Sequence, residues 1–358
     1  MQVPKPLPLG SAITIAAVLL FLLAAFAWAA GWIGARRIDG AAVLSALEYN
    51  GGVHEGYRRA HAKGLCFRGS FTANGEGTAL SRAFALRKGV YPVTGRFSLA
   101  GGNPLAADGR NVFRSMALVL RADSGEEWRM AMDHTPIFPV RDVASFVALQ
   151  RASKPDPATG KPNPAVMKAF LAAHPEVKTF QDFMAKNVLP DSFASSTFYS
   201  INAFRFHDAQ GNETMVRWQF EPEAILKGLD KAALPQMPRD FLFREIIDRV
   251  NDAPVTWQLK LVVANAGDVT DDATRAWKGP HHVVSAGTLQ IDEIASEADG
   301  GCRDLNFDPA ILPDGVGLSD DPLLAARSKA YSSSFIRRAG EKPGRGAFDA
   351  HLGARSVP

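Results

Sequence analysis

The sequence predicts an α+β fold built on a closed or nearly closed antiparallel β-sheet, with one long apolar helix ahead of it. Eight short runs have the alternating or β-branched pattern of strands, and helical periodicity separates some of them. No charged residue occurs between Lys5 and Arg36. With 358 residues, 46% of them hydrophobic and 22% charged, the chain is long enough for one or two domains with a substantial core.

The N-terminal stretch is the strongest compositional feature. Residues 11–33 are almost all Ala, Leu, Val, Ile, Phe and Trp, and a helix of this length spans the ~30 Å hydrocarbon layer of a membrane. We therefore expect a short tail over 1–10 and a transmembrane anchor over 11–33. Basic residues flank both ends, so the positive-inside rule does not decide the orientation. Because a single N-terminal span commonly exports the domain that follows it, we expect an inner-membrane protein with a periplasmic domain.

Residues 39–340 are expected to form one globular domain, starting with a short helix over 41–49. The predicted strands cover 65–73, 90–100, 114–122, 127–132, 196–207, 214–220, 256–263 and 283–294. Helices around a proline-rich loop are expected over 141–187, and two more over 241–250 and 321–337. The remaining residues, 341–358, are predicted to form a loose tail.

Charge and cysteine content exclude some classes of function. The net charge is +3 without a long block of like charges, which argues against a nucleic-acid partner. Cys66 and Cys302 are too few for a disulfide framework or a structural zinc site, and their number leaves open whether they pair. No glycine-rich dinucleotide fingerprint is present, so we do not expect a nicotinamide cofactor.

Two small constellations carry candidate chemistry. His61 lies in a cationic cluster over 58–64, where neighbouring charges favour a neutral imidazole that can act as a general base. Arg327 and Tyr331 are four residues apart on a predicted helix, so the guanidinium can reach the phenol and lower the cost of ionising it to bind a ferric ion. A solvated loop histidine and an ordinary surface helix are the plainer interpretations.

A set of motifs, in a fixed order along the chain, resembles the catalase family, and more closely its short branch of catalase-related heme peroxidases. The motifs are 58–64 (RRAHAKG), 95–101 (GRFSLAG), 133–138 (DHTPIF), 140–142 (VRD), 307–309 (FDP), 312–316 (LPDGV) and 320–331 (DDPLLAARSKAY). The resemblance covers about 47–338. It implies a catalase-like closed antiparallel barrel that binds ferric heme, of the heme b type, and acts on peroxide.

The resemblance also implies roles for single residues. Tyr331 would bind the iron as a phenolate, with its charge stabilised by Arg327. His61 would move the proton of the bound peroxide, and Ser98 would fix its tautomer. The remaining implied contacts with heme are Phe146, stacked on the ring, and Arg58, Arg96 and Arg338, bound to the two propionates.

Two departures from the family pattern affect the expected activity. Asp133 stands where the family has an asparagine, and a carboxylate accepts hydrogen bonds but does not donate them. We expect Asp133 to raise the pKa of His61, and His134 to be a substitute donor. These changes predict weak dismutation of hydrogen peroxide, with reduction of organic hydroperoxides by an external electron donor as the main reaction. The alternative is a heme-binding or heme-delivery protein without turnover.

The second departure is length, because little room remains for the N-terminal arm, wrapping segment and C-terminal domain of the larger family members. We therefore expect an open pocket that admits bulky peroxides, and a monomer or dimer.

Overall fold

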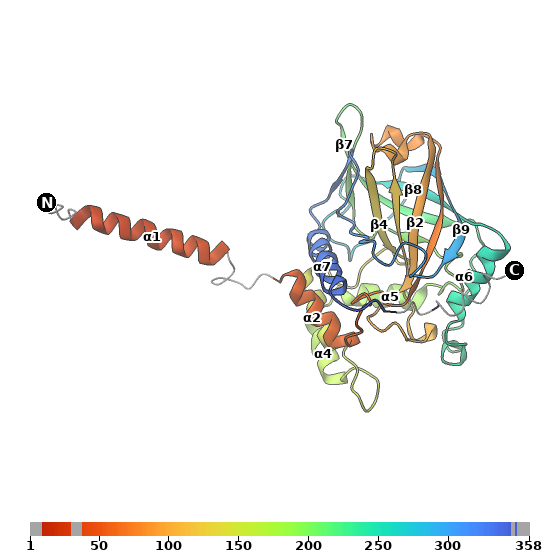
Figure 1. Ribbon diagram of the computed structural model, residues 1–358, viewed down its shortest axis with the longest axis horizontal. Coiled ribbons are helices and arrows are strands. Elements are labelled where there is room, and N and C mark those ends of the chain that lie inside the picture. Colours follow the sequence, from red (N-terminus) through yellow and green to blue (C-terminus); the bar gives the residue numbers. More distant parts are fainter. Residues whose placement is uncertain (1–8, 30–37, 345–347, 349–358) are drawn as a thin grey trace. The chain divides into compact units, whose positions relative to one another are not determined.

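Figure 1 shows the computed structural model, which describes residues 9–29, 38–344 and 348. The chain divides into two compact units, residues 1–39 and 40–358. The first contains helix α1 (Leu9–Ala29). Within the described ranges, no helix is both long and apolar enough to cross a membrane, so the predicted transmembrane helix is not confirmed. Residues 30–33 of the predicted anchor lie outside those ranges.

The second unit is built on a closed antiparallel barrel, as predicted. Its strands follow the order β7-β5-β4-β3-β2-β1-β9-β8, and β8 pairs with β7 to close the ring. These eight are β1 (Gly64–Ala73), β2 (Gly89–Leu99), β3 (Arg114–Arg121), β4 (Glu127–Asp133), β5 (Phe198–Tyr199), β7 (Glu213–Pro222), β8 (Val255–Val263) and β9 (Val283–Ala295). Two further strands, β6 (Phe204–His207) and β10 (Val316–Leu318), extend the sheet from β7.

One predicted strand, over 196–207, is divided in two in the structure. Ile201 has a φ of 65°, and this left-handed conformation is incompatible with a continuous strand. The backbone N–H of Asn202 donates to the carbonyl of Ser200 at 2.8 Å, which closes a turn between β5 and β6. The break brings the buried side chain of Asn202 to the start of the last helix, where it binds Asp321.

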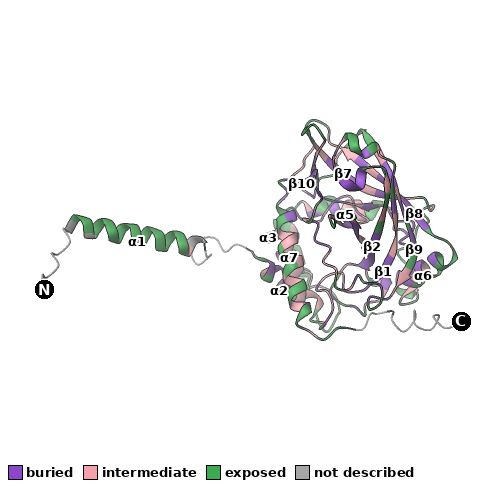
Figure 2. Ribbon diagram, turned by 45° about the horizontal axis from the view of Figure 1, so that its top comes forward, coloured by how far each residue is buried: buried purple, intermediate pink, exposed green. Residues whose placement is uncertain are grey.

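Alternation along the strands separates an inner from an outer face. Leu65 and Phe67 of β1 belong to the large core cluster, to which all eight barrel strands contribute. Cys66, between them, belongs instead to a small cluster with Val119. Successive strand residues point to opposite faces, so the large cluster fills the barrel and the small one lies on its outer face. Figure 2 shows the buried strands in purple.

Helices cover part of the barrel's outside. Their bounds are α2 (Gly40–Gly51), α3 (Val143–Ala152), α4 (Pro164–Ala173), α5 (Val177–Lys186), α6 (Phe241–Asp252) and α7 (Pro322–Ala339). Helices α2, α3 and α7 pack on one another (Figure 2). Helix α7 begins where the Asp321 carboxylate accepts from the N–H of Leu323, with proline in its first turn. Beyond it, Glu341 pairs with Arg59 and Phe348 is buried, while 345–347 and 349–358 of the predicted tail lie outside the described residues.

Candidate active site

Strand register places three polar side chains in one row. Ser98 of β2 lies opposite Ser115 of β3, which lies opposite Asp133 of β4. Directly paired residues of neighbouring strands project from the same face. Ala117, two residues from Ser115, contacts the outer cluster, so this row belongs to the outer face of the barrel.

His61 stands at the end of the row. Its Nδ1 is 3.4 Å from the Oγ of Ser98, and it precedes β1 in a left-handed conformation, with a φ of 55°. The N–H of Ala62 donates to the carbonyl of Gly101 and fixes the chain just after it. Because Ser98 engages Nδ1, Nε2 is the ring nitrogen left for chemistry.

Arg96 holds the backbone around His61. Its Nη1 donates to the carbonyl of His61 at 2.7 Å, its Nη2 donates to the carbonyl of Ala62 at 3.1 Å, and its Nε pairs with Glu297 at 2.7 Å. Gly64 makes this crossing possible, because a Cβ there would lie 2.4 Å from the Cζ of Arg96. All three guanidinium nitrogens are thus engaged within the protein, whereas the family resemblance implies that this group binds a heme propionate.

Electrostatics around His61 favour the neutral imidazole. Desolvation lowers its pKa, Asp133 raises it, and Arg96, Arg327 and Arg58 lower it further, so that the pKa lies below its usual value. Asp133 thus raises the pKa of His61, as expected, but the net pKa still lies below the usual value. Burial and three cations outweigh one carboxylate, and His61 is available as a base.

Asp133 is fixed by a residue that sequence reasoning missed. The hydroxyl of Ser115 donates to Oδ1 of Asp133. The sequence does hold a signal for Ser115. Once β2 and β3 are aligned as a hairpin, the residue opposite Ser98 is Ser115. The carboxylate is thus oriented by its own barrel neighbour.

The side chain of His134 is bound to the backbone of β3. Its Nδ1 accepts from the backbone N–H of Arg114 at 3.2 Å, and its ring meets the edge of Phe113. Burial and Arg114 lower the pKa of His134 to about 4. His134 follows the last residue of β4, and its side chain is bound to the backbone of Arg114, so it is not positioned as the donor that Asp133 lacks.

Helix α7 brings Tyr331 to the outer cluster of the barrel. Arg327, one helical turn earlier, donates from Nη1 to Oδ1 of Asn202 at 2.8 Å and from Nη2 to the carbonyl of Ala131 at 3.0 Å. It therefore ties α7 to β4 and to the turn after β5. A phenol in this position is a candidate metal ligand, whereas the described residues contain no group of three or more His, Cys, Asp or Glu suited to a metal ion.

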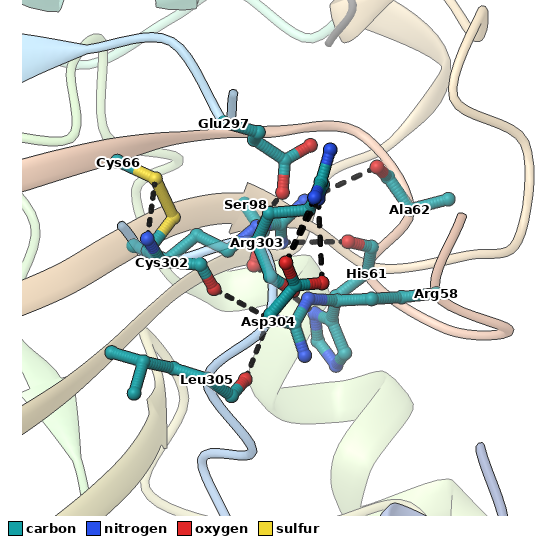
Figure 3. Close-up of polar contacts among 11 residues, drawn as sticks. Arg58, His61, Ala62, Cys66, Ser98, Glu297, Cys302, Arg303, Asp304 and Leu305 are labelled. Carbon is teal, nitrogen blue, oxygen red and sulfur yellow. Dashed lines mark hydrogen bonds and ion pairs between the residues drawn. A yellow bond between two sulfur atoms is a disulfide. The ribbon is translucent and has the colours of Figure 1, made fainter. Parts of the chain in front are cut away.

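Arg58 and Arg338 provide a cationic edge to the site. Arg58 donates from Nη2 to three carbonyls, and this arrangement is shown in Figure 3. Among the described residues, neither Nε of Arg58 nor Nη2 of Arg338 has a hydrogen-bond partner, although both atoms are buried. The two side chains line a small pocket together with Arg303 and Glu297. Unpartnered guanidinium N–H groups of this kind suit the carboxylate of a ligand.

Burial and like charge act together on this edge. Desolvation, followed by the charges of Arg96 and Arg338, lowers the pKa of Arg58 to about 9. An anion placed here would relieve that repulsion.

The last predicted site residue, Phe146, is on α3. Its ring stacks on Phe138 with centroids 5.9 Å apart, and Phe138 packs in turn against a cluster containing Leu323 of α7. Phe146 is thus connected to the helix that carries Tyr331 through one intervening ring.

Cys66 and Cys302 form a disulfide between β1 and the loop that follows β9, across 236 residues. The structure answers the pairing question that the number of cysteines left open.

Known proteins share both sequence and fold with this chain. The family model for catalase matches residues 55–343. The catalase-related peroxidase of Synechococcus elongatus is 37% identical over 83% of this chain and 87% of its own length, and that of Mycolicibacterium paratuberculosis is 30% identical over 83% and 94%.

Solved catalases have the same fold at lower identity. A fungal catalase superposes with a TM-score of 0.73 at 18% identity, and catalase A from Saccharomyces cerevisiae with 0.72 at 19%. The matches cover 83% and 80% of this chain but 62% of either catalase, so the chain spans about three fifths of their length. From the family match and the two peroxidase relatives together, the chain belongs to the catalase family of oxidoreductases that act on peroxide.

Proposed function

We propose that this protein is a heme-dependent peroxidase that reduces hydrogen peroxide and organic hydroperoxides with an external electron donor, protects against oxidative stress and dismutates hydrogen peroxide only weakly. The observation that carries the proposal is Asp133, oriented by Ser115 in the row that leads to His61. A carboxylate accepts hydrogen bonds where an amide also donates them. The row therefore offers a base and an acceptor to the peroxide.

Heme is the usual cofactor of the catalase family, and residues of this chain fit it. The buried, unpartnered nitrogens of Arg58 and Arg338 would bind its propionates. Tyr331 would bind the iron as a phenolate, which favours the ferric state of heme b. Heme would supply the redox chemistry of O–O cleavage.

The chain's own residues would move the proton. Neutral His61 takes the O–H proton of the hydroperoxide at Nε2 and returns it to the leaving oxygen, which departs as water or an alcohol. Ser98 holds Nδ1 and keeps the ring oriented during both transfers. When the substrate is hydrogen peroxide, Asp133 accepts a hydrogen bond from its second O–H group, and this contact orients the first O–H toward His61.

A comparison of Asp133→Asn with the wild type tests this function. The wild type should show a ferric heme spectrum that changes in Tyr331→Phe, and should oxidise a chromogenic reductant with hydrogen peroxide or tert-butyl hydroperoxide. Asp133→Asn should raise the ratio of dismutation to peroxidase turnover by about tenfold, the value of one neutral hydrogen bond. Asp123→Asn, in the exposed turn between β3 and β4, is the matched control.

Fast dismutation by the wild type that Asp133→Asn leaves unchanged would refute the proposal. Heme binding without turnover of either peroxide would favour a heme carrier.

We also propose that residues 11–33 anchor the protein in the inner membrane, with the second unit in the periplasm as a monomer or dimer. The uncharged apolar sequence supports the anchor, and the Cys66–Cys302 disulfide supports an oxidising compartment. A C-terminal reporter that is active only in the cytoplasm tests the topology, because its activity there would contradict the proposal.

A further inference from the structure

The position of Arg58 depends on one loop. Its Nη2 donates to the carbonyl oxygens of Cys302 at 2.9 Å, Arg303 at 3.1 Å and Leu305 at 2.9 Å. We call residues 302–305 the carbonyl loop. Its three carbonyl dipoles converge on a single nitrogen of the guanidinium, while the ring of Phe307 lies 5.5 Å from Cζ.

Arg58 needs this support because its cationic neighbours repel it. Arg96 and Arg338 both destabilise its charge, and burial removes the water that would screen them. Glu297 counteracts them, but its carboxylate is bound to Nε of Arg96. The carbonyl loop therefore offsets repulsion that would otherwise move Arg58 out of the site.

The loop itself is covalently fixed to the barrel. Its first residue, Cys302, is bonded to Cys66 of β1, and the N–H of Cys302 is 3.3 Å from the sulfur of Cys66 (Figure 3). Both half-cystines are fully buried on the outer face, in the cluster against which Tyr331 packs. Strand β1 starts three residues after His61. The disulfide thus joins the strand that follows the base to the loop that holds the arginine.

From this arrangement we propose that the Cys66–Cys302 disulfide is a positioning element of the heme site: it holds the carbonyl loop so that Arg58 is aimed at a heme propionate. The inference rests on the proposed heme-dependent function and extends it. Other contacts, such as Nη1 of Arg129 with the carbonyl of Asn306, keep the neighbouring chain in place. Loss of the disulfide should therefore loosen the carbonyl loop without unfolding the barrel.

The test measures binding of two porphyrins to the full-length apoprotein. Hemin has free propionates, whereas hemin dimethyl ester has none, so the ratio of their dissociation constants isolates the contribution of the carboxylates. We expect Cys66→Ala/Cys302→Ala and Arg58→Leu each to reduce the preference for hemin by about tenfold, the value of one charge-assisted hydrogen bond. The combined variant should lose little more, because both changes remove the same interaction.

A control and a second measurement separate positioning from general stability. Arg68→Leu removes a contact with the carbonyl of Asp299, just before the carbonyl loop, and should leave the preference unchanged. If the double-cysteine variant does not fold, reduction of the wild type by a phosphine, followed by thiol counting, allows the same comparison.

Two results would overturn the inference alone: hemin binding with an unchanged preference after loss of the disulfide, or fully additive losses in the combined variant. If the wild type bound neither porphyrin, the proposed function would fail together with the inference. This result differs from the two above, in which the wild type binds hemin.

Discussion

The two halves of the site are held in different ways. The strand half consists of Ser98, Ser115 and Asp133, whose positions follow from the continuous ladder of β2, β3 and β4. The helix half is α7 with Tyr331, and Arg327 ties this helix to the barrel through side-chain hydrogen bonds. A backbone ladder persists when a side chain is replaced, whereas a side-chain hydrogen bond is lost. Substitutions in the strand half should therefore change chemistry, and substitutions around the helix half should change position and stability.

The largest effect expected in the strand half is that of His61→Ala. Removal of a general acid–base should reduce kcat/KM for either peroxide by about 10²–10⁴-fold. Stability should change little, because the hydrogen bond lost with the imidazole, to Ser98, is long at 3.4 Å. Stopped-flow kinetics with thermal unfolding checks both parts. A loss of less than tenfold would show that another group moves the proton.

The helix half should respond most to Asn202→Ala. Asn202 accepts from Arg327 and donates to Asp321, which also caps α7. Its removal leaves two charged groups short of a partner and should cost about 2 kcal/mol. Denaturant unfolding measures this cost, and hydrogen exchange should increase over 322–339. Asn212→Ala, in the exposed β6–β7 turn, is the control, and equal losses in both variants would contradict a special role for Asn202.

The same division explains what the sequence predicts well. Alternation is a local property, so the strands and the barrel follow from it, and family motifs select His61 and Tyr331. The break at Ile201 escaped prediction because a left-handed φ in a β-branched residue depends on tertiary contacts. Ser115 escaped because its role appears only once strand register is known.

The direction of long side chains also could not be predicted from the sequence. Arg96 has the expected motif, but its guanidinium crosses Gly64 to bind the carbonyl of His61. The Cys66–Cys302 bond links residues whose proximity only the folded barrel defines.

A smaller effect is expected from Ser115→Ala, which separates the contribution of the Ser115 hydroxyl from that of the strand ladder. The register that places Asp133 remains, but its carboxylate loses a donor. We expect about a tenfold loss of peroxidase kcat/KM with little loss of stability. The pH profile should shift as well, since Asp133 opposes the lowering of the His61 pKa by burial and by the nearby arginines. Ser115→Thr should restore both, and a loss of stability without a change in profile would assign Ser115 a purely structural role.

The smallest effect concerns acid stability beside the strand row. Burial and Arg114 lower the pKa of His134 from 6.5 to about 4, so between these values the unfolded chain binds a proton that the folded protein does not. Stability is therefore full above about pH 6.5 and falls as the pH is lowered toward 4. His134→Asn, which does not titrate, should reduce this slope in denaturant unfolding series. His61, whose pKa is also lowered, contributes in the same direction, so part of the slope should persist. An identical slope in the variant would mean that His134 has the same pKa in the folded and unfolded chains. Its imidazole would then be open to water in the folded protein.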